Sequence, residues 1–145
     1  MVKKLPNKLS SLIRVALDDL HKVENDPKFR VDMSDWYHSN SHCAVCFAGG
    51  VMAFSLGKGA NGGHQYPENF GRQNEGKLVA IDQCRIGDFS SALDEMRDHG
   101  CDWITDEHIA KAERVDRFVV GYDRSKREFK AQMRKAAIEL RSLGL

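Results

Sequence analysis

The stretch that decides the fold lies near the end of the first third of the chain and reads Ser41-His42-Cys43-Ala44-Val45-Cys46-Phe47-Ala48-Gly49-Gly50-Val51-Met52-Ala53-Phe54. From residue 43 onward its only polar atoms are two thiols and the backbone. A helix that is apolar on every side is buried, so we expect a central core helix over about residues 43–56. Small residues recur four positions apart, which lets a neighbouring helix approach closely and offsets the cost of glycine within a helix.

Helical periodicity also dominates the segments on either side. Apolar residues recur at three- and four-residue spacing after Asn7, a candidate cap, and again after Ser125. Shorter helices are expected around residues 78–84, 89–96 and 105–119, and a helical turn over 33–38. Residues 28–33 alternate as a short strand does, and residues 57–76 hold six of the 12 glycines, which predicts a long loop. We predict a mainly α fold, a compact single domain over residues 1–145 with about six helices and a minor β element.

Composition excludes several classes of protein. The 145 residues are 41% hydrophobic and 30% charged, with a formal net charge of +1. These values indicate a globular chain and argue against a protein that coats nucleic acid through overall charge. No apolar run reaches the roughly 18 residues of a membrane span, and no signal peptide is recognised. We therefore expect a cytoplasmic protein without a membrane partner, whose four cysteines are free thiols or metal ligands.

The pair Cys43 and Cys46 is the first candidate for chemistry. A thiol at a helix N-terminus ionises more easily, and one turn separates it from a second thiol that resolves a disulfide. Cys43 is also a candidate nucleophile, with His64 as a candidate base. The interpretation weighed against these is that the cysteines are small buried hydrophobes, which is common for free thiols.

The same segment contains candidate zinc ligands. His38, His42, Cys43 and Cys46 lie within nine residues, and two thiols at this spacing are the usual half of a zinc site. A second close pair of ligands is missing from the sequence. We therefore predict no cofactor, with zinc held by these four residues as the alternative.

The C-terminal segment is basic. Between Arg124 and Arg141 there are seven basic and two acidic residues. A polyanion is attracted to such a face, which makes Arg124, Arg127, Lys130 and Arg134 candidates for nucleic-acid binding. A solvated face of an amphipathic helix is the competing interpretation, because no aromatic residues are interleaved there.

Three short patterns resemble small proteins of unassigned function encoded by bacteriophages and prophages. The patterns are Asp32-Met33-x-x-Trp36, then Cys43-x-Val45-Cys46-x-Ala48-Gly49-x-Val51-Met52-Ala53, then Leu78-x-Ala80-Ile81-Asp82-x-x-Arg85-x-Gly87, and the resemblance spans residues 9–93. It implies a viral accessory protein in the bacterial cytoplasm that binds a host macromolecule, such as a host protein targeted by an anti-defence factor. No complete catalytic constellation is present, so we expect a non-enzymatic role. The alternatives are a thiol-dependent enzyme or zinc module at Cys43 and Cys46, and a weak nucleic-acid binder that uses the C-terminal helix.

Overall fold

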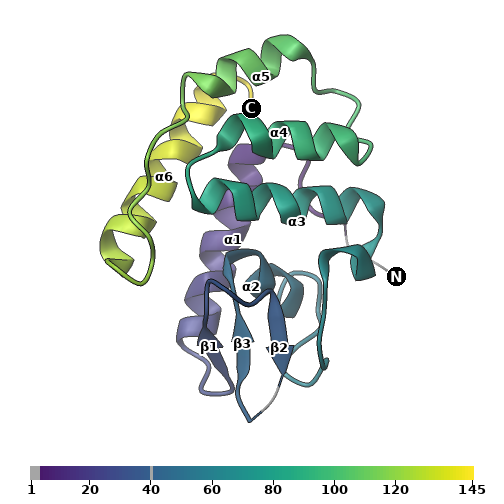
Figure 1. Ribbon diagram of the computed structural model, residues 1–145, viewed down its shortest axis with the longest axis vertical. Coiled ribbons are helices and arrows are strands. Elements are labelled where there is room, and N and C mark those ends of the chain that lie inside the picture. Colours follow the sequence, from purple (N-terminus) through teal and green to yellow (C-terminus); the bar gives the residue numbers. More distant parts are fainter. Residues whose placement is uncertain (1–3, 40) are drawn as a thin grey trace.

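The computed structural model describes residues 4–39 and 41–145, which form a mainly α fold with one small sheet (Figure 1). The helices of this described part are α1 (Leu9–Glu24), α2 (Phe47–Ala53), α3 (Arg72–Arg85), α4 (Phe89–Asp98), α5 (Asp106–Glu113) and α6 (Lys126–Ser142), with a 3₁₀ turn, η1 (Pro67–Phe70). The strands are β1 (Phe29–Val31), β2 (Tyr37–Ser39) and β3 (Cys43–Val45). The predicted fold class is therefore confirmed. No helix within the described ranges is both long and apolar enough to cross a membrane.

The helices are arranged around α1. It packs against α6 along one side and against α2 and α3, while α3 packs against α4 and α4 against α5. Figure 1 shows α3 and α4 side by side in front of α1, α6 along the left flank, and the sheet at the lower end of the molecule. The side of α1 that faces neither α2 nor α3 therefore lies beside α6.

The prediction of one helix over 43–56 is wrong at both ends. Residues 43–45 form the central strand, which pairs in parallel with β1 and antiparallel with β2, so that Cys43 lies opposite both Phe29 and Ser39. Helix α2 then covers only residues 47–53. A strand that is buried on both faces has the same apolar composition as a buried helix, so composition did not separate the two. The expected helical turn over 33–38 is also wrong, because residues 37–39 form β2.

The predicted burial and close packing of the central helix are confirmed. All seven residues of α2 are buried. A Cβ atom on Gly49 would lie 1.7 Å from the carbonyl oxygen of Trp36, and a Cβ atom on Gly50 would lie 3.4 Å from Cγ2 of Val23 in α1. The two glycines therefore bring α2 against the chain before β2 on one side and against α1 on the other.

The two long helices differ in how they begin. The side chain of Ser125 accepts from the backbone N–H of Glu128 at 3.2 Å and caps α6. Asn7 is not the cap of α1, which begins after Lys8 without a side-chain cap. The side-chain oxygen of Asn7 instead accepts from Nζ of the buried Lys77 at 3.1 Å.

Two other boundaries differ from the prediction. The loop expected over residues 57–76 is shorter, since η1 begins at residue 67 and α3 at residue 72. The helix expected over 105–119 ends at residue 113, and the chain then runs without regular structure to α6. Both differences lie where apolar spacing gives no clear start or stop signal.

Candidate functional site

The structure assigns Cys43 and Cys46 to the core. Cys43 and Cys46 are each 2% exposed, and all four cysteines are free and buried. Cys43 lies in a strand, so no helix begins at this residue and the expected ionisation of its thiol by a helix dipole does not apply. Cys46 is the N-cap of α2, and its sulfur accepts from the backbone N–H of Gly49 at 3.3 Å. The second thiol therefore serves as a capping group.

The pKa values of both thiols are raised, which makes the thiols less reactive. Burial raises the pKa of Cys43, which a hydrogen bond with the Tyr37 hydroxyl offsets only in part. Burial raises the pKa of Cys46 to about 12. Since the thiolate is the nucleophile and the metal ligand, neither cysteine is prepared for that chemistry.

The candidate base His64 is engaged elsewhere. Its ring packs on the ring of His38, with 4.1 Å between the centroids. No hydrogen bond joins His64 to Cys43 in the part of the chain that the structure describes. The expected nucleophile and base are therefore not assembled into a pair.

The candidate zinc ligands are not gathered into one site. Within residues 4–39 and 41–145, no group of three or more His, Cys, Asp or Glu side chains is placed to hold a metal ion. His42 is exposed at the start of β3, whereas Cys46 turns inward to the N-terminus of α2. The strand between them separates side chains that a helix would have brought together.

The basic residues of α6 are brought to a groove by contact with α1. The groove has a volume of about 680 Å³ and is lined by Arg14, Leu17, Asp18, His21, Lys22, Lys130 and Arg134. We call it the α1/α6 groove. Two predicted residues, Lys130 and Arg134, line it; the other two, Arg124 and Arg127, are exposed outside it.

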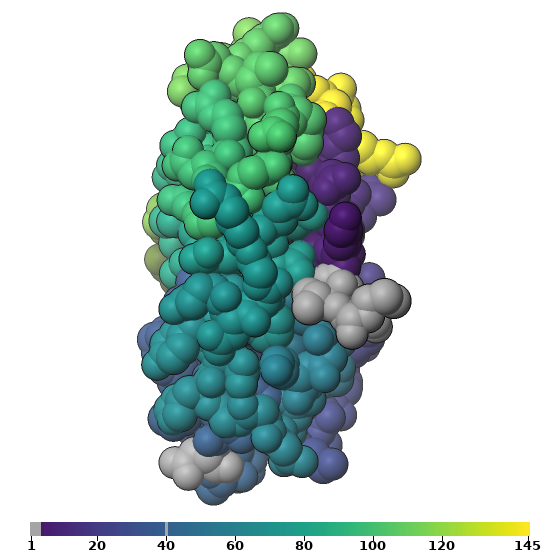
Figure 2. All heavy atoms as spheres, turned by 90° about the vertical axis from the view of Figure 1, so that its right-hand side faces the viewer, coloured from purple at the N-terminus to yellow at the C-terminus, as the bar shows by residue number. Residues whose placement is uncertain are grey.

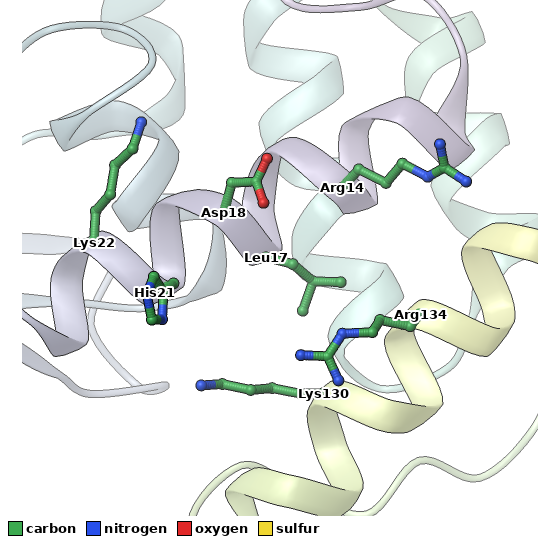
Figure 3. Close-up of a pocket in the computed structure, with 7 residues that line it drawn as sticks. All are labelled: Arg14, Leu17, Asp18, His21, Lys22, Lys130 and Arg134. Carbon is green, nitrogen blue, oxygen red and sulfur yellow. The ribbon is translucent and has the colours of Figure 1, made fainter.

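The side chains of the groove come from both helices. Figure 3 shows Lys130 and Arg134 extending from α6 toward α1, and His21 and Leu17 extending from α1 toward α6. Lys22 points away from α6 in the same view. The groove is thus open to solvent and bordered by cations on both walls.

One cation of the groove is held by an internal ion pair. Nζ of Lys130 donates to the carboxylate of Glu24, which also accepts from the hydroxyl of Tyr122 at 2.5 Å. Burial acts to raise the pKa of Glu24, but the hydrogen bonds from Lys130 and Tyr122 and the charges of Lys130 and Lys126 outweigh it, and the pKa is lowered. The carboxylate therefore remains ionised and positions Lys130 against α1.

A second cation is partly neutralised at the edge of the groove. Nζ of Lys22 lies 3.4 Å from Oδ1 of Asp19, whose other oxygen accepts from the Ser55 hydroxyl at 2.5 Å. Burial raises the pKa of Asp19, although Ser55 and Lys22 oppose the shift. This carboxylate links α1 to the end of α2 and reduces the contribution of Lys22 to the groove.

Two guanidinium groups of the groove are exposed and, within the described ranges, not engaged in internal ion pairs. Among the described residues, neither Arg14 nor Arg134 has a hydrogen-bond or ion-pair partner, and both are exposed. They lie on opposite walls of the groove, with Asp18 as the one carboxylate among its lining residues. Figure 3 shows their guanidinium groups extending in opposite directions along the groove, so each offers a separate unpaired donor to an anionic ligand.

A second hollow lies at the start of α1. This hollow, of about 350 Å³, is lined by Lys8, Ser10, Ser11, Arg14, Arg141, Gly144 and Leu145. Nζ of Lys8 donates to the Gly144 carbonyl at 2.9 Å and lies 4.2 Å from the centre of the Trp103 ring. Because Arg14 lines both hollows, they are neighbours along α1 and α6, and we call the two together the basic path.

The charge of the molecule is segregated. Residues 88–113, which include α4 and α5, carry eight acidic and two basic side chains, against two acidic and seven basic between residues 124 and 141. Figure 2 shows the green α4 and α5 on one side of the molecule and the purple of α1 and the yellow C-terminal end on the other. The net charge of +1 is therefore distributed unevenly, with an acidic segment at α4 and α5 and a basic segment at α6.

Sequence patterns did not predict the α1 half of the groove. Arg14 and His21 belong to the polar face of an ordinary amphipathic helix and have no motif of their own. Their one signal was position, since Arg14, Asp18 and Lys22 recur every fourth residue on one helix face. Only the packing of α6 on that edge made the face part of a groove.

Comparison with known proteins adds no relative from which function could be transferred. No protein-family model, no curated protein and no solved structure matches the chain.

Proposed function

We propose that this chain is a non-enzymatic binding protein that holds an anionic macromolecule in the α1/α6 groove. The observation that carries the proposal is the pair of unpartnered guanidinium groups, Arg14 and Arg134, on opposite walls of one groove. Unpaired arginines lose no internal ion pair when they bind an anion, and their planar groups bind carboxylate or phosphate through two hydrogen bonds.

The setting that we propose is that of a viral accessory protein acting on a macromolecule of its bacterial host. This part of the proposal is supported by the phage-like patterns around Trp36, Cys46 and Ala80. A binding role agrees with the buried thiols, whose raised pKa values disfavour catalysis by Cys43 or Cys46.

Heparin is a suitable probe because it is a regular polyanion without bases or a protein surface. We expect labelled heparin to bind the purified protein at low salt, as measured by fluorescence anisotropy. Arg14→Glu and Arg134→Glu should each weaken binding about tenfold, because each reverses an unpaired charge in the groove. Binding that survives both substitutions would contradict the proposal.

Lys135→Glu is the matched control. Lys135 follows Arg134 directly and is exposed, but it does not line the groove. Lys135→Glu and Arg134→Glu have the same net charge, so an effect of overall charge would weaken binding equally in both variants. We expect a loss of less than about twofold for Lys135→Glu, with circular dichroism showing that every variant is folded.

The thiol and zinc alternatives have their own test. Slow labelling of all four native cysteines, together with a purified protein that contains no metal, would remove both. Rapid and selective labelling of Cys43, or one equivalent of bound zinc, would support the thiol or zinc alternative and contradict the binding role.

A further inference from the structure

The basic path is longer than a single anion requires. Its lining residues run from Lys8, just before α1, to Lys22 near the end of that helix, which corresponds to roughly 21 Å at about 1.5 Å per residue. On α6 the lining cations Lys130, Arg134 and Arg141 recur on the facing side of the helix. The cations are therefore distributed along a track rather than gathered at a point.

We propose that the ligand of this track is the phosphodiester backbone of duplex nucleic acid, an inference that rests on the proposed function. Each strand of a duplex presents one phosphate about every 3.4 Å along the axis. A track of roughly 21 Å thus faces about six phosphates of one strand. Arg14, Arg134 and Arg141 line the track and are available to them, and Lys8 becomes available when it exchanges its hydrogen bond to the Gly144 carbonyl for a phosphate.

The composition of the track favours nucleic acid over an acidic protein. Leu17 is the one apolar side chain among the seven that line the larger hollow. Stable protein interfaces have an apolar core rich in aromatic residues, whereas interfaces with nucleic acid are polar and strongly positive. Both hollows are lined mainly by charged and hydroxyl side chains, whose aliphatic stems supply apolar surface, and it is their positive charge that favours nucleic acid.

The same composition favours a duplex over a single strand. Within residues 4–39 and 41–145, no Phe, Tyr or Trp lines either hollow, and proteins that hold single strands stack bases on such rings. The nearest indole, that of Trp103, is covered by Lys8 and donates its N–H to the Asn7 carbonyl at 3.1 Å. Because the proposed contacts are to phosphates, which carry no sequence information, binding is expected to be independent of base sequence.

The acidic side of the molecule limits how a duplex approaches. Eight carboxylates in residues 88–113 repel phosphates from the α4 and α5 side, and this side faces away from α1 in Figure 2. Repulsion on one side and attraction on the other orient the encounter. One duplex is therefore expected per basic track.

The test compares four probes on the intact protein by anisotropy: heparin, a mixed-sequence duplex DNA of about 20 base pairs, a single strand of the same length, and poly-glutamate. We expect the duplex to bind about tenfold more tightly than the single strand, and poly-glutamate to compete weakly. The logarithm of the duplex association constant should fall with log salt at a slope of about −3 to −4. Two duplexes of unrelated sequence should bind alike.

Variants in the second hollow give the sharpest readout. Arg141→Glu and Arg134→Glu should each reduce the magnitude of the salt slope by about one, while Lys135→Glu leaves it unchanged. If heparin binding depends on Arg14 and Arg134 but the duplex binds no better than the single strand, the inference fails and the proposed function stands. The inference also fails, and the proposed function stands, if poly-glutamate competes as well as the duplex. Heparin binding that does not depend on Arg14 and Arg134 overturns both the inference and the proposed function.

Discussion

The β3–α2 segment and the α1/α6 groove both contain residue types that perform chemistry, but their surroundings differ. In the first, Cys43 and Cys46 are enclosed by the core and burial raises the pKa of each. In the second, Arg14 and Arg134 are exposed and unpaired within the described part of the chain. The comparison indicates that a motif becomes a site only where its groups reach solvent and lack internal partners.

The largest expected effect tests the packing of the first region. Gly49→Ala would place a Cβ atom 1.7 Å from the Trp36 carbonyl oxygen, and overpacking against backbone should lower the free energy of unfolding by about 3 kcal/mol. Urea denaturation measures the loss. Gly50→Ala is the matched control, because its Cβ would meet Val23 at 3.4 Å and alanine favours the helix by about 1 kcal/mol. Equal losses in both variants would contradict the packing described here.

The capping role of Cys46 predicts a smaller effect. Cys46→Ala removes the sulfur that accepts from Gly49 N–H and should lower the free energy of unfolding by about 1–2 kcal/mol. Cys46→Ser retains an acceptor of a type preferred at helix N-caps and should lose less. A larger loss for serine than for alanine, in the same denaturation assay, would show that the sulfur acts through packing alone.

The Glu24–Lys130 pair connects core and groove. The folded-state pKa of Glu24 lies below its ordinary value of 4.5, so its contribution to stability is present above pH 4.5 and is lost as the pH falls through the folded-state pKa. Glu24→Gln should therefore lower the free energy of unfolding by about 1 kcal/mol at neutral pH, with a difference from wild type that vanishes in acid.

Glu24→Gln should also increase the affinity of the α1/α6 groove for an anion. Without the carboxylate, Lys130 is free to bind an anion, so heparin affinity should rise about two- to threefold while stability falls. Glu113→Gln, at an exposed carboxylate outside the groove, should change neither quantity. A loss of heparin affinity in Glu24→Gln would mean that Glu24 is needed to position Lys130.

The smallest expected effect is at Cys43. Cys43→Ala should leave the heparin dissociation constant within about a factor of two of wild type, because the thiol is buried in β3, away from the lining of the groove. Anisotropy at low salt checks this. A marked loss of binding would show that the two regions are functionally coupled.

Sequence periodicity predicted the long helices well and the short elements poorly. Helices α1 and α6 have clear amphipathic spacing, and Ser125 is a preferred capping residue. Strand β3 was mistaken for helix, because Cys-Ala-Val in a fully apolar run fits either structure. What selects the strand is pairing with Phe29 and Ser39, and such pairing depends on contacts that no local window contains.

By itself, the sequence determined the fold class, the burial of the segment around Gly49 and Gly50, and the basic character of the last helix. These properties follow from side-chain volume, hydrophobicity and charge, which are local. Only the tertiary structure decided that Cys46 caps a helix and that Arg14 faces the same groove as Arg134, 120 positions later in the chain. Electrostatic attraction for a ligand depends on distance in space, and chain folding alone sets that distance.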